Sequence, residues 1–179
     1  MTDPLGEVAM VAIRCGVLAG MLLVLGGLAG AQQPSGGKVE LKVVKYDELG
    51  DIIRQNRGKV VVVDFWATNC GPCKELFPEL VEMHRKYARD GLVAISVSTD
   101  DLSESPESKE VALKFLQKQN ATFTNLLLDE KGEFWAEKLH SNALPFCFVF
   151  NRDGKWYQFK GKDSYAQIEP LVQQLLQQK

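Results

Sequence analysis

The spacing of hydrophobic residues changes repeatedly along the chain, and each change predicts a switch between strand and helix. Residues 60–63 are apolar at every position, which is typical of a strand buried on both faces of a sheet. From Cys73 to about Arg89 apolar residues recur at helical spacing, and residues 92–98 form the next strand-like run. A strand, a helix and a second strand in this order indicate a right-handed parallel crossover. The pattern therefore predicts an α/β protein.

Shorter segments on either side extend this alternation. Strands are expected at 39–44, 123–128, 146–150 and 156–159, and helices at 46–55, 109–118, 134–139 and 164–178. The helix at 109–118 should place Val111, Phe115 and Leu116 on its core face. Arg152-Asp153-Gly154 has the composition of a hairpin turn, so the strands before and after it should pair antiparallel.

The amino-terminal segment differs in composition from the rest. Arg14 is followed by an apolar and glycine-containing run, residues 15–29, and then by Ala29-Gly30-Ala31, a pattern suited to signal peptidase. We interpret residues 1–31 as a signal peptide, or as an N-terminal membrane anchor if they are not cleaved, although the run is shorter than the ~20 residues of a spanning helix. Residues 32–38 are polar and Gly-rich, which is typical of a flexible linker. The folded domain is therefore expected at 39–179.

The overall composition is that of an ordinary globular protein. Of the 179 residues, 45% are hydrophobic and 25% are charged, which suits a single packed core. The chain has 21 Lys and Arg against 23 Asp and Glu, and nothing in this balance indicates a nucleic-acid partner. We expect a monomer that touches a membrane only if the leader is retained.

Two cysteines separated by two residues, Cys70 and Cys73, stand where the strand pattern gives way to the helix pattern. At the start of a helix, free backbone N–H groups and the helix dipole favour a thiolate on Cys70. Half of a zinc site is one alternative, but it would need a second pair or histidine partners, and the chain offers only His84, His140 and Cys147, scattered along it. An inert structural disulfide is the other alternative. We favour a redox-active pair that uses no metal and no cofactor.

The residues around this pair resemble a known active site. The segment Phe65-Trp66-Ala67-Thr68-Asn69-Cys70-Gly71-Pro72-Cys73-Lys74 is similar to that of the thioredoxin superfamily, and with the leader it looks most like the TlpA-like thiol-disulfide reductases of bacterial envelopes. Further matches to the family are Asp64, Pro78, the Leu144-Pro145 pair and Gly161. The resemblance covers residues 39–179. It implies a thioredoxin-like fold, with a central mixed β-sheet flanked by helices on both faces.

The resemblance, together with simple chemistry, suggests roles for these residues. Cys70 would attack a partner disulfide, and Cys73 would then displace the reduced partner. Asp64 interrupts an apolar strand, so burial should raise its pKa and let it take the proton from Cys73; the alternative is a structural strand-end carboxylate. Pro145 should follow a cis bond, the alternative being an ordinary trans turn. Contacts with the partner are expected at Trp66, Gly71, Pro72, Leu144 and Pro145, and Trp66 should also shield the sulfurs.

Two positions depart from the family pattern. Asn69 stands where related reductases usually carry tryptophan, which removes an aromatic contact with partners but leaves the thiol chemistry intact. Phe146-Cys147 follows the proline where small hydroxyl residues are common. Cys147 lies in an apolar run, so we expect it to pack in the core as a small hydrophobic residue.

The resulting hypothesis is a thiol-disulfide oxidoreductase that reduces protein disulfides in the periplasm or cell envelope. Its partners would be disulfide-containing proteins and an upstream reductant. One alternative is a peroxiredoxin-like peroxidase, which would need a Pro-x-x-x-Thr/Ser-x-x-Cys approach, and the approach to Cys70 contains no proline. The other alternative is a redox-inert thioredoxin-like binding module.

Overall fold

The computed structural model of the protein describes residues 37–141 and 143–178. The expected leader, residues 1–31, and most of the expected linker lie outside this range, so both stay predictions. Within the described ranges, no helix has the length and apolar character needed to cross a membrane.

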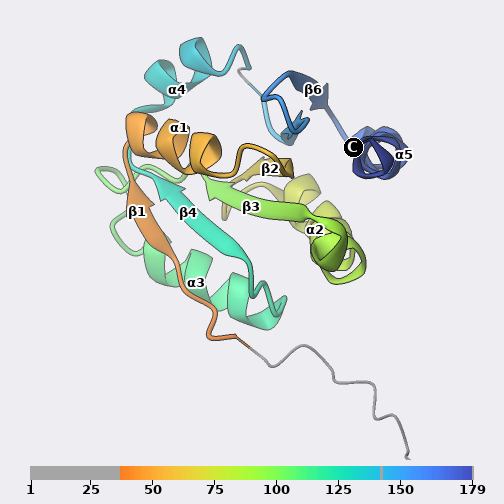
Figure 1. Cartoon of the computed structure of the whole chain (residues 1–179). Coiled ribbons are helices and arrows are strands. Elements are labelled where there is room, and N and C mark those ends of the chain that lie inside the picture. The colour runs from red at the N-terminus through yellow and green to blue at the C-terminus, as the bar shows by residue number, and fades with distance from the viewer. Residues whose placement is uncertain (1–36, 142, 179) are drawn as a thin grey trace, which may run out of the picture. The chain divides into compact units, whose positions relative to one another are not determined.

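Six strands form one mixed sheet, as the resemblance implied (Figure 1). In spatial order they are β1 (Lys42–Val44), β4 (Thr124–Leu128), β3 (Leu92–Ser98), β2 (Val60–Trp66), β5 (Phe146–Phe150) and β6 (Trp156–Lys160). The first four run parallel, whereas β5 is antiparallel to β2 and β6 is antiparallel to β5. The predicted parallel pairing of β2 and β3 and the predicted hairpin are therefore confirmed.

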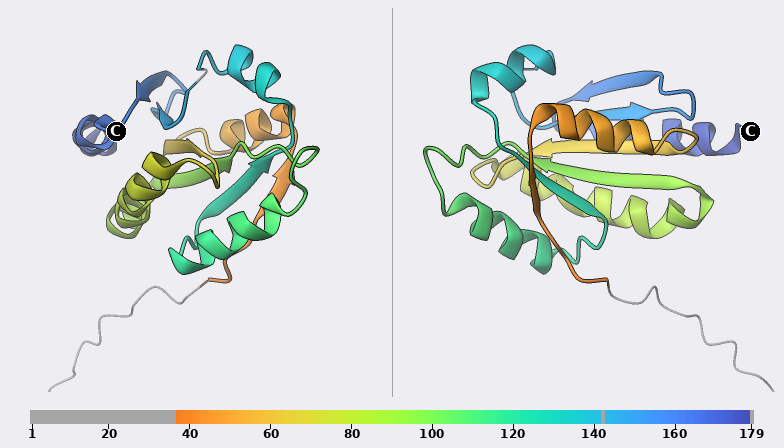
Figure 2. Two further views of the ribbon diagram at one scale, coloured as in Figure 1. Left: turned by 180° about the vertical axis from the view of Figure 1, so that it is seen from behind. Right: turned by 60° about the vertical axis from the view of Figure 1, so that its left-hand side comes forward.

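Helices cover both faces of the sheet (Figures 1 and 2). One face packs against α1 (Tyr46–Gln55) and α4 (Gly132–Lys138). The opposite face packs against α2 (Gly71–Tyr87), α3 (Ser108–Lys118) and α5 (Ser164–Gln177). A short 3-10 turn, Ala88–Asp90, ends α2 before β3. The α/β fold class is confirmed.

Strand β2 lies at the centre of the sheet, and each of its residues is buried. Val61, Val63 and Phe65 belong to the core beneath α1 and α4. The alternate residues point to the other face, because successive side chains of a strand alternate. Asp64 is therefore a carboxylate placed on the α2 and α5 side of the sheet, among side chains that gain roughly 1.5–3 kcal/mol each by burial.

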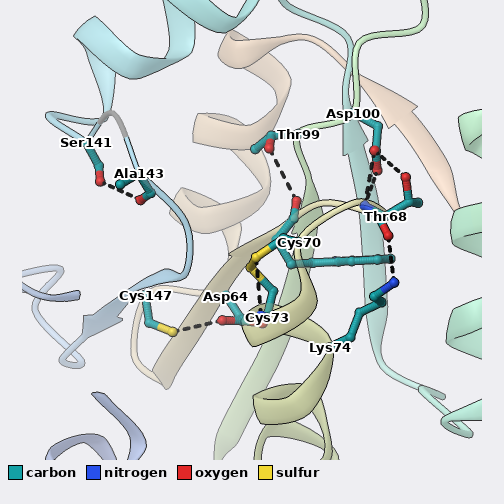
Figure 3. Close-up of a disulfide and its surroundings, with 11 residues drawn as sticks. Asp64, Thr68, Cys70, Cys73, Lys74, Thr99, Asp100, Ser141, Ala143 and Cys147 are labelled. Carbon is teal, nitrogen blue, oxygen red and sulfur yellow. Dashed lines mark hydrogen bonds between the residues drawn. A yellow bond between two sulfur atoms is a disulfide. The ribbon is translucent and has the colours of Figure 1, made fainter. Parts of the chain in front are cut away.

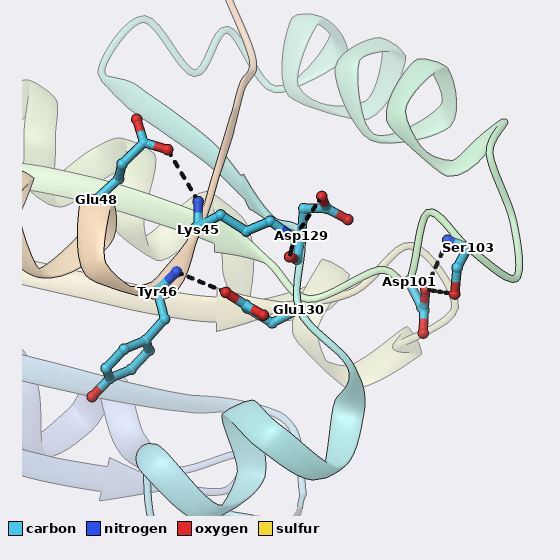
Figure 4. Close-up of polar contacts among 7 residues, drawn as sticks. All are labelled: Lys45, Tyr46, Glu48, Asp101, Ser103, Asp129 and Glu130. Atoms are coloured by element: carbon cyan, nitrogen blue, oxygen red, sulfur yellow. Dashed lines mark hydrogen bonds and ion pairs between the residues drawn. The ribbon is translucent and has the colours of Figure 1, made fainter.

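Polar contacts cap the start of α1 and attach it to the end of β4 (Figure 4). The backbone N–H of Lys45 donates to Glu48 at 3.2 Å, and that of Tyr46 donates to Glu130 at 3.2 Å. The Lys45 ammonium also pairs with Asp129 at 2.9 Å. These groups are mostly exposed, so they fix the direction of the chain more than they add stability.

The structure corrects several local expectations. Val111 is 48% exposed and so does not belong to the core face of α3. Leu116 is buried and Phe115 packs against the core, both as expected, and Ala112 is buried beside them. The first strand begins at Lys42, α2 begins at Gly71 and α4 begins at Gly132. Gly161 follows β6, with a φ of +86° that favours glycine.

Candidate active site

Cys70 and Cys73 form a disulfide at the amino end of α2 (Figure 3). Their sulfurs are 1.98 Å apart and their Cα atoms 5.3 Å apart. Cys70 is the N-cap residue of the helix, and its sulfur accepts the backbone N–H of Cys73 at 3.2 Å. Cys73 is 1% exposed, whereas Cys70 is partly exposed. Cys70 is therefore the more accessible of the two cysteines to a partner.

The electrostatics at this helix end favour a thiolate on Cys70. The first turn of α2 contains no acidic residue and has Pro72 near its start, so the free N–H groups and the positive end of the dipole face the Cys70 sulfur. The Lys74 ammonium donates to the carbonyl of Thr68 at 2.9 Å, which places a positive charge on the same loop. Both features lower the cost of a negative charge on the Cys70 sulfur.

A buried carboxylate holds the loop that precedes Cys70. Asp100, which is 8% exposed, accepts the backbone N–H of Thr68 at 3.1 Å and its hydroxyl at 2.6 Å. The Ser98 hydroxyl donates to the same carboxylate. Sequence analysis did not single out Asp100. The available signal was its position just after a buried strand that neighbours β2, because parallel strands end at the same edge of a sheet.

Asp64 is buried, at 3% exposure, and it faces Cys147 of the neighbouring strand. The two residues are register partners across β2 and β5, and the Cys147 thiol donates to Asp64 Oδ1 at 2.9 Å (Figure 3). Burial raises the pKa of Asp64 to about 6, and its interactions with Cys147 and Tyr165 oppose this rise. The raised pKa of Asp64 agrees with expectation. The alternative was a structural strand-end carboxylate, but here the hydrogen-bond partner of Asp64 is the buried Cys147 side chain.

Cys147 is a core residue, as expected. It is 0% exposed, and among the described cysteines it is unpaired. Burial, together with the nearby Asp64 carboxylate, raises the pKa of its thiol well above the usual range. Cys147 therefore keeps its proton and is a poor nucleophile.

The bond between Leu144 and Pro145 is cis, as predicted. The Pro145 carbonyl accepts the N–H of Gly161 at 3.0 Å. Leu144 is partly exposed and packs against the cluster that contains Trp66 and Cys73. Its backbone N–H and C=O make no hydrogen bond with the residues that the structure describes, so a partner chain can pair with them.

Aromatic side chains pack in the same buried cluster as Cys73. Trp66 is 0% exposed, and its ring lies 5.5 Å from that of Phe77 and 4.9 Å from that of Phe115. The expected contact between Trp66 and a partner does not fit this burial, whereas the expected packing role does. Gly71 is exposed and Pro72 is partly exposed, so both remain available to a partner.

The remaining candidate ligands lie apart. His84 on α2 packs against Phe123, with ring centroids 5.2 Å apart, and His140 follows α4 on the other face of the sheet. In residues 37–141 and 143–178, no group of three or more His, Cys, Asp and Glu side chains is arranged to hold a metal ion.

Comparison with known proteins identifies the family. The model of the AhpC/TSA family matches residues 39–157, which is more than half of the chain. The chain belongs to the AhpC/TSA family.

Relatives and solved structures agree with this assignment. Thiol-disulfide oxidoreductase ResA of Bacillus thuringiensis is 28% identical over 94% of each chain. Sporulation thiol-disulfide oxidoreductase A of Bacillus subtilis is 27% identical over 78% of this chain and 81% of its own. The structure is also similar to that of a thiol:disulfide interchange protein DsbE from Chlorobium tepidum, with a TM-score of 0.58, 27% identity, and coverage of 69% of this chain and 84% of that one.

Family, fold and the bonded pair of cysteines together define a thioredoxin-like thiol-disulfide oxidoreductase. The resemblance to the thioredoxin superfamily is thereby confirmed. The alternative of a redox-inert binding module is set aside, because the relatives are oxidoreductases and Cys70 is partly exposed at a helix start.

Proposed function

We propose that this oxidoreductase reduces disulfides of partner proteins outside the cytoplasm. The observation that carries the proposal is the Cys70–Cys73 disulfide, in which Cys70 is partly exposed and Cys73 is buried. A second support is the neighbouring Leu144 backbone, which is free to pair with an extended peptide. A protein partner would use both features at once.

The chemistry begins with the reduced pair. The Cys70 thiolate attacks one sulfur of the partner disulfide, which forms a Cys70–partner bond and breaks the partner's own S–S bond. Cys73 then attacks Cys70, which restores the Cys70–Cys73 disulfide and expels the partner's second thiolate. Two electrons pass to the partner, whose thiolates take protons from water. An upstream dithiol must reduce Cys70–Cys73 again.

Asp64 receives the proton of Cys73 during the second step. Cys73 is buried, so its thiol cannot lose a proton directly to bulk water. Asp64 lies on the same side of the sheet, and its pKa of about 6 leaves it ionised at neutral pH and basic enough to accept a proton. The proton returns to solvent before the next cycle.

The expected leader supports a location outside the cytoplasm. Residues 1–31 end in a small-residue cleavage pattern after an apolar run, and exposed protein disulfides persist in such compartments. Amino-terminal sequencing of the exported protein should return Gln32. Recovery of Thr2 in the membrane fraction would instead support an uncleaved anchor.

The central test is trapping of the mixed disulfide. A Cys73→Ala variant lacks the sulfur that expels the partner, so it should accumulate partner proteins bound through Cys70, and these should be released by dithiothreitol. Cys70→Ala is the matched control, because it removes the attacking sulfur and should trap nothing. The proposal fails if both variants capture the same proteins, or if the wild-type protein does not reduce insulin disulfides.

A peroxidase assay separates the alternative function. A peroxiredoxin-like site would need proline at residue 63 and Thr or Ser at residue 67, and this chain has Val63 and Ala67. Val63 is also fully buried in β2. Reduction of hydrogen peroxide should therefore be much slower than reduction of insulin at equal protein concentration, and the opposite order would favour the peroxidase.

A further inference from the structure

Two buried polar side chains adjoin Asp64, and the exchange steps above use neither of them. Cys147 on β5 donates its thiol hydrogen to Asp64 Oδ1 at 2.9 Å. Tyr165 in the first turn of α5 is 6% exposed and belongs to the same core cluster as Cys147. The surrounding side chains of this cluster are mainly apolar, and burying a polar group among them costs free energy unless it has a hydrogen-bond partner.

Tyr165 has an unusual environment for a tyrosine. Its hydroxyl is buried and has no hydrogen-bond partner of normal geometry among the described residues. Burial raises the pKa of Tyr165 well above its usual range, and the negative charge of Asp64 raises it further. The hydroxyl is therefore an unpartnered donor in the same buried cluster as Cys147, whose thiol contacts Asp64.

We propose that Cys147 and Tyr165 are positioning residues for Asp64, which orient its carboxylate and set the pH range in which it can accept the proton of Cys73. The proposal rests on the proposed function and adds two residues to it. Neither side chain reacts: both keep their protons, and no bond to sulfur or oxygen is formed or broken.

Hydrogen bonds to a carboxylate favour its charged form, so donors beside Asp64 should lower its pKa. Burial raises the pKa of Asp64, while its interactions with Cys147 and Tyr165 lower it. If these two donors were absent, Asp64 would stay protonated at higher pH. It would then be unable to act as a base over part of the neutral range, so the donors extend activity toward lower pH.

Other titratable groups near this position are few. From α2 the buried Cys73 faces the same side of the sheet, and from β3 the register partner of Asp64 is Ser96, whose hydroxyl donates to Asn125. The charged side chains that line a pocket together with Tyr165 are Glu79, Glu82, Lys86 and Glu169 of α2 and α5. Lys86 and Glu169 pair with each other at 2.7 Å, and this pairing lowers the pKa of Glu169.

The test measures the protonation of Asp64 directly in the purified full chain. Infrared spectroscopy of the oxidised protein follows the C=O stretch of the protonated carboxyl from about pH 4 to pH 9, and Asp64→Asn identifies the band. Cys147→Ala and Tyr165→Phe should each move the midpoint upward by about 0.5–1 pH unit. Cys147→Ser keeps a donor and should stay within ~0.3 unit of wild type.

A matched control separates hydrogen bonding from packing. Val149 lies two residues along β5 on the same face, is 0% exposed and pairs with Val62 instead of Asp64. Val149→Ala should lower the melting temperature without moving the midpoint. Tyr165→Phe preserves the ring and should fold even if Cys147→Ala does not. Unchanged midpoints in Tyr165→Phe and in the folded Cys147 variant that lacks a donor would overturn the proposal.

The pH dependence of insulin reduction then separates this inference from the proposed role of Asp64. The low-pH limb is the range in which the rate falls as the pH is lowered. It should shift with the infrared midpoint in Cys147→Ala and Tyr165→Phe, so that the rate at pH 6 falls roughly 2- to 5-fold. If Asp64→Asn keeps the wild-type limb, Asp64 is not the proton acceptor, yet shifted infrared midpoints would still establish the positioning pair. If Asp64→Asn loses the limb while the midpoints stay fixed, only the positioning pair fails.

Discussion

Replacement of Asp64 by asparagine should make the protein more stable at neutral pH, and the structure gives the size of the gain. Burial raises the pKa of this carboxyl from 3.8 to about 6, so the folded chain binds the proton more tightly than the unfolded chain does. Raising the pH through this interval therefore removes stability. The difference of about two pH units, at 1.36 kcal/mol each, corresponds to a loss of about 3 kcal/mol.

Asparagine retains the shape of the side chain and an oxygen that can accept the Cys147 thiol hydrogen, but it carries no charge at any pH. The free energy of unfolding of the oxidised protein, measured in urea for wild type and Asp64→Asn, gives the effect as a difference. Below about pH 4 the two proteins should be similar, and by about pH 7.5 the variant should be more stable by ~2–3 kcal/mol. Other titrating groups cancel, because both proteins contain them.

The prediction requires the difference in stability to grow as the pH rises. A difference that is the same at both pH values would show that Asp64 titrates normally in the folded state. A variant that is less stable at neutral pH would show that the ionised carboxylate stabilises the fold through its partners. In the same variant, insulin reduction at neutral pH should slow by roughly 10-fold or more, because the general base is lost.

Two further substitutions test residues that hold the loop and the core next to the disulfide. Asp100→Ala removes the acceptor that holds Thr68, so kcat/KM for insulin should fall roughly 3- to 10-fold. Asp101 is adjacent but makes no hydrogen bond with Thr68, so Asp101→Ala should leave kcat/KM unchanged. Equal effects of the two substitutions would refute the role assigned to Asp100. Phe77→Ala should lower the free energy of unfolding, measured by chemical denaturation, by about 3–5 kcal/mol, because this fully buried ring packs on Trp66. The half-exposed Phe134, changed to Ala, should cost less than ~1 kcal/mol, and similar losses for both would contradict the packing.

The elements that sequence analysis located best are those with an unbroken apolar pattern. Strands β3 and β5 have the expected bounds, and β2 begins where expected and continues to Trp66, because strands buried on both faces leave predominantly apolar runs. The spacing within a helix is less informative. In α3 the predicted core face included Val111, which is exposed, whereas Phe115 and Leu116 pack in the core as predicted.

The thiol site was predictable because its parts are adjacent in sequence. Cys70, Cys73 and the helix start lie within one short segment, and Pro145 could be assigned by resemblance. The support from Asp100 could not be found in this way, because it depends on two parallel strands ending side by side. Its contact with Thr68 joins residues 32 positions apart.

The buried network around Asp64 shows the same limit most clearly. Asp64 and Cys147 were each singled out, one as a costly carboxylate in an apolar strand and the other as a core thiol, with no connection between them. The antiparallel register of β2 and β5 pairs them across 83 positions of sequence, and shifting that register by one residue would turn Cys147 to the opposite face. The environment that sets the protonation of Asp64 is thus a property of strand pairing. For that reason a change at Cys147, a residue that does not react, is expected to alter the pH dependence of the reaction.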